Sequence, residues 1–324
     1  MSDVLVKIAG LTRHFDVSKP LLNRVLQREG RKILTAVEDV NFEIERGSTY
    51  ALVGESGSGK STIAKMLVGL VQPTSGSVLI DDVNLASASD ESAAKLRQRI
   101  QMIFQDPFAS LNPRWRVREI VGEPYAAFNK VSTAEISLRV DELLEKVGMS
   151  SRDAMKYPHE FSGGQRQRIG IARALSSDPE FIVCDEPTSA LDVSVQAQVL
   201  NLMRDLQSSL GLTYLFITHD LAVVRYMADQ VGVLYLGRLV EHASRVALFQ
   251  NPKHPYTKML LDSAPRLDGF DRVHESNGGE IPDPINRPVG CHFHPRCEHA
   301  TLQCKSTSPP FKRDGSSVYA CYLD

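Results

Sequence analysis

The feature that most constrains the fold is a glycine-rich octapeptide at residues 54–61, Gly-Glu-Ser-Gly-Ser-Gly-Lys-Ser. It follows the strand-like run Tyr50–Val53 and precedes a segment whose apolar residues recur with helical spacing. Such glycines let the backbone curl until successive N–H groups point at one anion, and the following helix adds the positive end of its dipole. Because a chance glycine-rich turn rarely has this context, the pattern predicts a phosphate-binding loop.

Two side chains in this loop carry the expected chemistry. Lys60 is expected to neutralise the β and γ phosphates of ATP, and Ser61 to offer its hydroxyl to Mg²⁺, a cation that prefers oxygen ligands. The predicted nucleotide-binding residues of the loop are Gly54, Ser56, Gly57, Gly59, Lys60, Ser61 and Thr62.

Two carboxylates follow a second apolar strand, Phe181–Cys184. Asp185 can bind Mg²⁺ through water, and Glu186 can polarise an attacking water as a general base. Taken alone the pair is weak evidence, because acidic residues after a buried strand are often only solvated turn residues. A further apolar run, Thr213–Ile217, also follows a helical segment, which predicts a parallel sheet whose sites gather at the carboxyl ends of the strands.

A second anion-binding helix start is expected at Ser162-Gly163-Gly164-Gln165, which precedes a helical segment through Leu175. With the phosphate loop and the acidic pair, this motif resembles the nucleotide-binding subunits of ATP-binding-cassette (ABC) proteins. In that family Ser-Gly-Gly-Gln of one subunit closes over ATP held by the phosphate loop of the other. The resemblance covers about residues 5–250 and implies a working dimer with two shared sites.

The resemblance also assigns roles to four residues elsewhere in the chain. Phe15 is similar to the aromatic that stacks on adenine, and Gln105 to the glutamine that joins the Mg²⁺ site to a helical subdomain. Asp192, in Ser189-Ala190-Leu191-Asp192, resembles the loop that crosses the dimer interface. His219 resembles the histidine that contacts the γ phosphate. The Mg²⁺ ligands implied are Ser61, Gln105 and Asp185, and the catalytic residues are Glu186, His219 and Gln105.

Three stretches, at residues 105–114, 189–198 and 252–257, resemble the ATPases of dipeptide and oligopeptide importers. The insertion after Phe15 is more similar to the second of the two unlike ATPases in such importers. This implies a heterodimer with a second ATPase subunit, two transmembrane permeases and, indirectly, an extracytoplasmic substrate-binding protein. Nickel, oligosaccharide or antimicrobial peptide transport by the same family stays an alternative, as does a soluble ABC ATPase without a membrane partner.

The expected fold class is α/β, a P-loop ABC nucleotide-binding domain. We expect a mostly parallel sheet flanked by helices, an antiparallel β subdomain and a helical subdomain at about residues 106–178. The domain boundaries predicted are 1–265 for the ATPase and 266–324 for an irregular arm with a cysteine-rich tail. Apolar residues near Gln105 and Trp115 are expected either to accept a coupling helix of a permease or to be ordinary core.

Four of the five cysteines lie in the last 34 residues, at Cys291, Cys297, Cys304 and Cys321. No gap between them is the two-residue spacing of zinc knuckles. Similar importer ATPases end in a tail of this kind, which implies a [4Fe-4S] cluster held by four thiolates. Zn²⁺ stays an alternative, because His292, His294 and His299 lie nearby.

Charge and hydropathy limit the partners. Thirty-seven basic and 39 acidic side chains leave a net charge of −2, which gives no electrostatic footprint for nucleic acid. Residues 1–10 show no secretion signal, and no apolar run reaches the roughly 18 to 20 residues that span a bilayer. We therefore expect a peripheral protein at the cytoplasmic face of the inner membrane, held there by its partners.

Overall fold

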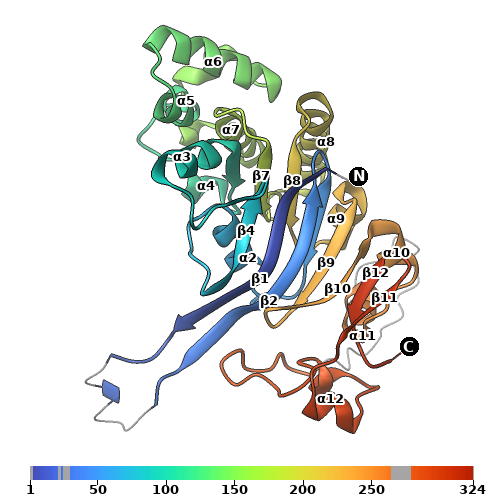
Figure 1. Cartoon of the computed structure of the whole chain (residues 1–324). Coiled ribbons are helices and arrows are strands. Elements are labelled where there is room, and N and C mark those ends of the chain that lie inside the picture. Colours follow the sequence, from blue (N-terminus) through green and yellow to red (C-terminus); the bar gives the residue numbers. More distant parts are fainter. Residues whose placement is uncertain (1–2, 21–22, 25–29, 264–278, 324) are drawn as a thin grey trace.

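The computed structural model describes residues 3–20, 23–24, 30–263 and 279–323 (Figure 1). The first sheet of the described chain comprises β1 (Val4–Asp16), β2 (Ile33–Glu45), β4 (Ser75–Ile80) and β5 (Val83–Asn84). These strands are antiparallel, in the order β2-β1-β4-β5. Where the connecting segment leaves the β1–β2 hairpin, the Val17 amide donates a 3.0 Å hydrogen bond to the Lys32 carbonyl. The insertion noted after Phe15 lies partly outside the described residues.

The second sheet comprises β3 (Thr49–Val53), β6 (Ile100–Ile103), β7 (Phe181–Asp185), β8 (Thr213–Ile217), β9 (Gln230–Tyr235), β10 (Arg238–Ser244), β11 (Phe311–Asp314) and β12 (Ser317–Ala320). Its strand order is β11-β12-β10-β9-β3-β8-β7-β6, and the segment from β9 to β6 is parallel. The expected parallel sheet is confirmed, and its last strands come from the end of the chain.

The α-helices of the described chain are α2 (Lys60–Leu67), α3 (Asp90–Arg99), α4 (Pro107–Ser110), α5 (Val117–Phe128), α6 (Thr133–Lys146), α7 (Gly163–Leu175), α8 (Val193–Leu210), α9 (Leu221–Met227), α10 (Arg245–Gln250), α11 (Pro255–Ser263) and α12 (Leu302–Ser306). Short 3₁₀ turns are η1 (Ser151–Met155), η2 (Pro158–Glu160) and η3 (His294–Arg296). No helix of the described residues is both long and apolar enough to cross a membrane.

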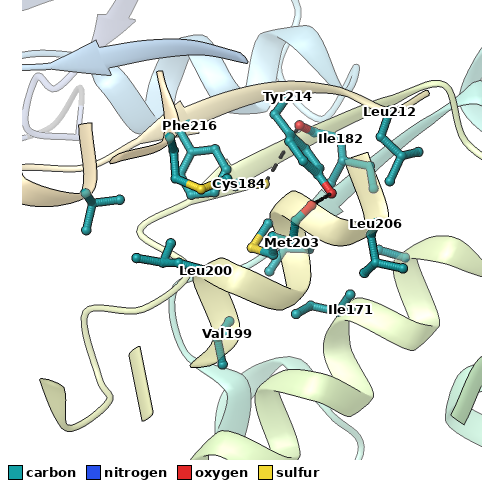
Figure 2. Packing of buried hydrophobic residues seen from close by; sticks show 14 of the residues in the cluster. Ile171, Ile182, Cys184, Val199, Leu200, Met203, Leu206, Leu212, Tyr214 and Phe216 are labelled. Atoms are coloured by element: carbon teal, nitrogen blue, oxygen red, sulfur yellow. Dashed lines mark hydrogen bonds between the residues drawn. The ribbon is translucent and has the colours of Figure 1, made fainter. Parts of the chain in front are cut away.

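The central strands β3, β7 and β8 are buried along their whole length, as continuous apolar runs in a parallel sheet should be. Helix α8 covers one face of this sheet with Val199, Leu200, Met203 and Leu206 (Figure 2). The Tyr214 hydroxyl of β8 donates a 3.0 Å hydrogen bond to the Met203 carbonyl, which ties the helix to the strand. This core holds the strand ends that carry Asp185 and Glu186.

Helices α5, α6 and α7 lie together at one end of the molecule, apart from the β1–β2 hairpin (Figure 1). Within the helical subdomain predicted at about residues 106–178, the stretch from Val117 to Gly148 forms two helices, because α5 ends at Phe128 and α6 begins at Thr133. The Ser132 side chain accepts the Glu135 amide and caps this second helix.

The end of the chain packs against the ATPase sheet. Strand β12 pairs antiparallel with β10 and carries β11 on its outer edge. At the start of the arm and tail predicted at 266–324, residues 279–288 form neither helix nor strand, and residues 264–278 lie outside the described part. Phe293 is 3% exposed and belongs to the same core cluster as β9 and α11. The tail is therefore attached to the larger core by both strand pairing and packing.

Candidate active site

Two glycines of the phosphate loop meet backbone so closely that no side chain fits. A Cβ on Gly59, where φ is 106°, would lie 2.3 Å from the Ala36 carbonyl oxygen of β2. A Cβ on Gly54 would lie 2.2 Å from the Leu234 carbonyl oxygen of β9. The loop thus curls tightly between β3 and α2, with both sheets against it.

Lys60 lies over this curled backbone and is 6% exposed. Its Nζ donates to the carbonyl oxygens of Gly54 and Glu55, at 2.7 and 2.9 Å, and more weakly to the Ser58 hydroxyl. Burial lowers the pKa of Lys60, while the nearby carboxylates of Glu186 and Asp185 act against that shift. The ammonium group is therefore held at the centre of the loop.

Ser61 and Asp185 form an oxygen-rich pair at the start of α2 and the end of β7. The Ser61 hydroxyl donates a 3.1 Å hydrogen bond to Asp185 Oδ1. Asp185 is 6% exposed, and burial raises the pKa of its carboxyl group. A hydroxyl and a carboxylate at this spacing fit the oxygen ligands that Mg²⁺ prefers.

Glu186 is held from two sides. Its Oε2 accepts a 2.8 Å hydrogen bond from Gln105 Nε2, and its Oε1 lies 3.0 Å from His219 Nδ1. The Glu186 side chain is 16% exposed, whereas His219 is 64% exposed. The chain thus gathers Gln105, Glu186 and His219 beside the Ser61–Asp185 pair, as expected for groups at the carboxyl ends of parallel strands.

Ser162 is the N-cap of α7. Its hydroxyl accepts the Gln165 amide, and the Gln165 side chain accepts the Ser162 amide in return, a capping box. Gly164 lies against the first turn of α8, since a Cβ there would lie 2.4 Å from Val195, three residues after the exposed Asp192. In the described part of the chain, no hydrogen bond joins residues 162–165 to the phosphate loop. Ser162 and Gln165 are exposed, Gly163 and Gly164 are half-buried, and the motif is separate from the loop of its own chain.

The other predicted nucleotide-binding residues lie in the phosphate loop, directly after it, or on β1. Ser56 and Gly57 are exposed at its tip, and the Thr62 amide donates to the Gly59 carbonyl at 3.1 Å. Phe15 is half-buried on β1, opposite Leu34, with the Arg13 guanidinium 4.5 Å from its ring centre. In the β1–β2 pairing, Phe15 lies two residue pairs from the pair that contains Val37. The residue before Val37, Ala36, is the one that contacts Gly59 of the phosphate loop.

The four tail cysteines converge on one small cavity, which Cys291, Cys297, Cys304 and Cys321 line together with His254 and Phe293. Burial raises the pKa of the Cys291 thiol to about 11 and also raises the pKa of Cys297 and Cys321. Among residues 3–20, 23–24, 30–263 and 279–323, no three His, Cys, Asp or Glu side chains are placed to hold a metal ion. His294 and His299 also line the cavity, whereas His292 does not.

Sequence reasoning missed the residues that brace the phosphate loop from outside. The Glu55 carboxylate pairs with Arg296 of η3 through two hydrogen bonds, of 2.7 and 3.0 Å. The Tyr256 hydroxyl of α11 accepts the Glu55 amide at 2.9 Å. Because 241 residues separate Arg296 from Glu55, no local pattern could have predicted this pair.

Known proteins resemble this chain over nearly its whole length. A family model described as "ABC transporter" matches residues 37–189, and one described as "Oligopeptide/dipeptide transporter, C-terminal region" matches residues 240–304. The oligopeptide transport ATP-binding protein AppF of Bacillus subtilis is 48% identical over 315 residues, which cover 95% of each chain. The dipeptide transport ATP-binding protein DppF of Haemophilus influenzae is 46% identical and covers 99% of this chain and 97% of its own.

A solved structure of an ATP-binding cassette is similar to most of this chain. The dimeric ATP-binding cassette MJ0796, bound to ADP and phosphate, is 30% identical with a TM-score of 0.64, and covers 74% of this chain and 99% of its own. The phosphate loop, the acidic pair and the helical subdomain all lie inside the ABC transporter match. The chain therefore belongs to the ABC-transporter ATPases, in the branch that carries the oligopeptide/dipeptide transporter C-terminal region.

Proposed function

We propose that this chain binds and hydrolyses MgATP to power an importer of dipeptides or oligopeptides. The observation that carries the proposal is the match of both the cassette and the C-terminal region, together with relatives named for peptide transport across almost the whole chain. The chain works with a second ATPase subunit and two transmembrane permeases, which hold it at the cytoplasmic face of the membrane. An extracytoplasmic binding protein delivers the peptide.

In the proposed mechanism, different residues at the strand ends bind phosphate, hold Mg²⁺ and act as the general base. Lys60 and the loop amides bind the β and γ phosphates, while Ser61, Asp185 and Gln105 would hold Mg²⁺, which would supply positive charge to the transferred phosphoryl group. Glu186 takes a proton from the attacking water. This role is supported by its position between Gln105 and His219, since two hydrogen bonds fix its carboxylate. His219 contacts the γ phosphate.

The second half of each site is proposed to come from the partner ATPase. Ser162, Gly163, Gly164 and Gln165 are exposed or half-exposed at the start of α7, and Asp192 is exposed beside them. In a dimer these groups of one subunit close over ATP bound to the other, while Phe15 stacks on adenine in its own subunit. Hydrolysis then releases the pair, and this closure and opening drives alternating access in the permeases.

Exposed aromatic residues beside Gln105 support a permease contact. Phe108 is 63% exposed and Trp115 is 41% exposed, and the Arg166 guanidinium lies 3.6 Å from the Phe108 ring centre. An amphipathic helix can lay its apolar face on such residues. We assign this surface to the coupling helix of a permease.

We also propose that the four tail cysteines hold a [4Fe-4S] cluster. The proposal is supported by the convergence of four thiols on one cavity lined by Phe293. In such a cluster each thiolate binds a different iron, so the sulfurs need not surround one point. A single Zn²⁺ is less well supported, because the described residues include no group of three ligands placed to hold an ion. The cluster would supply folding free energy to the tail, and no step of hydrolysis involves it.

The direct test is affinity purification of the tagged chain from detergent-solubilised membranes of its source. We expect two permeases and a second ATPase to co-purify, and the reconstituted complex to hydrolyse ATP faster when a peptide-loaded binding protein is added. A chain that elutes without membrane subunits would support the soluble alternative. Stimulation by nickel or oligosaccharide, and not by peptide, would reassign the cargo. Anaerobic iron and sulfide assays with Cys291→Ser as the comparison test the cluster.

A further inference from the structure

Glu55 is the point at which the C-terminal extension, residues 279–323 of the described chain, contacts the phosphate loop. Its carbonyl accepts Lys60 Nζ, so its main chain is part of the nucleotide site. Its carboxylate is bound by Arg296, which lies between Phe293 and Cys297 in the extension. One residue of the loop is therefore held by a segment beyond the ABC transporter match.

Burial and packing hold the Arg296 side chain in this position. It is only 6% exposed, and Glu55 is 25% exposed. The guanidinium packs beside the rings of Tyr235 and Phe293, each with its centre 5.9 Å away, and one nitrogen lies 3.7 Å from Met259 Sδ. A bidentate, charge-assisted pair with such packing fixes both partners in one geometry, unlike an exposed ion pair.

A second set of contacts from the extension reaches the same loop through the β9–β10 turn. Arg287 donates to the Leu236 carbonyl at 2.9 Å and pairs with Glu38 at 2.8 Å. The neighbouring Gly237 amide donates to the Ser58 carbonyl of the phosphate loop at 2.8 Å. The extension thus supports the loop at Glu55 directly and at Ser58 through the turn.

We propose that Arg296 is a positioning residue for ATP: by holding Glu55, the C-terminal extension keeps the phosphate loop in its nucleotide-binding geometry. The physical reason is that a phosphate loop binds through N–H groups whose directions depend on the backbone, so a shift of Glu55 turns the amides that follow it. The inference rests on ATP binding by the loop, and it is independent of the cargo and of what the thiol cavity holds.

Coupling of this kind acts in both directions. If the extension favours the ATP-binding geometry of the loop, bound ATP must stabilise the extension by the same free energy. ATP should therefore slow hydrogen exchange of backbone amides in residues 291–321, although none of these residues belongs to the proposed nucleotide site.

The test measures the equilibrium dissociation constant of ATP for the purified complex, in EDTA so that no turnover occurs. Arg296→Gln and Glu55→Gln should each weaken ATP binding by about fivefold or more, the lower end of typical couplings between sites. The double variant should be no weaker than either single variant, because both remove one interaction. Arg296→Lys should retain part of the affinity, since an ammonium can make one of the two contacts.

The Glu55→Gln variant distinguishes an effect of loop positioning on ATP binding from a purely electrostatic effect. It removes a negative charge near the phosphates, so a purely electrostatic effect would tighten ATP binding, whereas loss of positioning weakens it. Glu55→Gln should also abolish the ATP-dependent protection of residues 291–321. It leaves every residue of the extension unchanged, so it keeps the test valid even if Arg296→Gln unfolds the tail.

The matched control is Arg313→Gln, an exposed arginine on β11 of the same extension, which should bind ATP as the unsubstituted protein does. The proposal is overturned if Glu55→Gln binds ATP within twofold of the unsubstituted complex or more tightly. It is also overturned if ATP leaves hydrogen exchange of residues 291–321 unchanged in the unsubstituted complex.

Discussion

At the scale of single residues, the carboxylate of Glu186 is the group on which the proposed chemistry depends. Glu186→Gln keeps the size of the side chain and an oxygen that can accept from Gln105, but removes the base. We expect ATP binding to be retained and phosphate release to slow by roughly two to four orders of magnitude. Single-turnover assays of the complex measure this. Glu145→Gln, at an exposed position of α6, is the control and should hydrolyse ATP normally.

A half-buried histidine, His242, gives the residue-scale prediction for pH. His242 of β10 shares a 2.8 Å hydrogen bond with the Tyr50 hydroxyl. Burial lowers the pKa of His242 below the usual 6.5, and the positive charge of Arg313 adds to this shift. Between its lowered folded pKa and about 6.5, the unfolded chain binds a proton that the folded chain does not. The stabilising contribution is thus present above pH 6.5 and is lost as pH falls.

We therefore expect His242→Gln to reduce the slope of stability against pH below 6.5, by at most about 1.4 kcal/mol per pH unit. Urea unfolding of the isolated chain at several pH values measures this slope. Equal slopes in both proteins would show that His242 does not titrate differently in the folded state.

At the scale of elements, α8 is tied to β8 by the Tyr214 hydroxyl (Figure 2). Tyr214→Phe leaves the packed ring in place and removes this buried hydrogen bond, so the free energy of unfolding should fall by about 0.5 to 1.5 kcal/mol. Tyr226→Phe is the matched control, because Tyr226 also bonds to α8, at Asn201, but is 38% exposed. Urea unfolding should show a smaller loss for the control, and equal losses would contradict the role given to burial.

The elements also show what a sequence can and cannot predict. The apolar runs of β3, β7 and β8 and the glycine-rich loop were predicted correctly, because hydrophobic period and turn chemistry are local properties. Strand β11 was not predicted, since Phe-Lys-Arg-Asp has no apolar alternation and forms a strand only by pairing with β12. The contact of Arg296 with Glu55 depends on tertiary packing of distant segments, which leaves no local pattern.

At the scale of the whole molecule, the phosphate loop is supported by both sheets and by the extension, while the Ser162 motif faces outward. Within the candidate site, sequence motifs predicted Lys60, Ser61, Asp185 and Glu186, and the fold brings these four side chains together. The motif at Ser162 could be found from its capping pattern, but its proposed partner could not, because in the proposed dimer that partner belongs to another subunit. Each complete site of the proposed dimer therefore requires a second chain.

The most direct test is a structure of the complete transporter with Glu186→Gln and bound MgATP, determined by electron microscopy. We expect ATP on Lys60 of this chain with the γ phosphate in contact with the serine-glycine motif of the second ATPase, and Ser162 of this chain in contact with the other ATP. Nucleotide bound wholly within single chains, with Ser162 facing solvent, would contradict it.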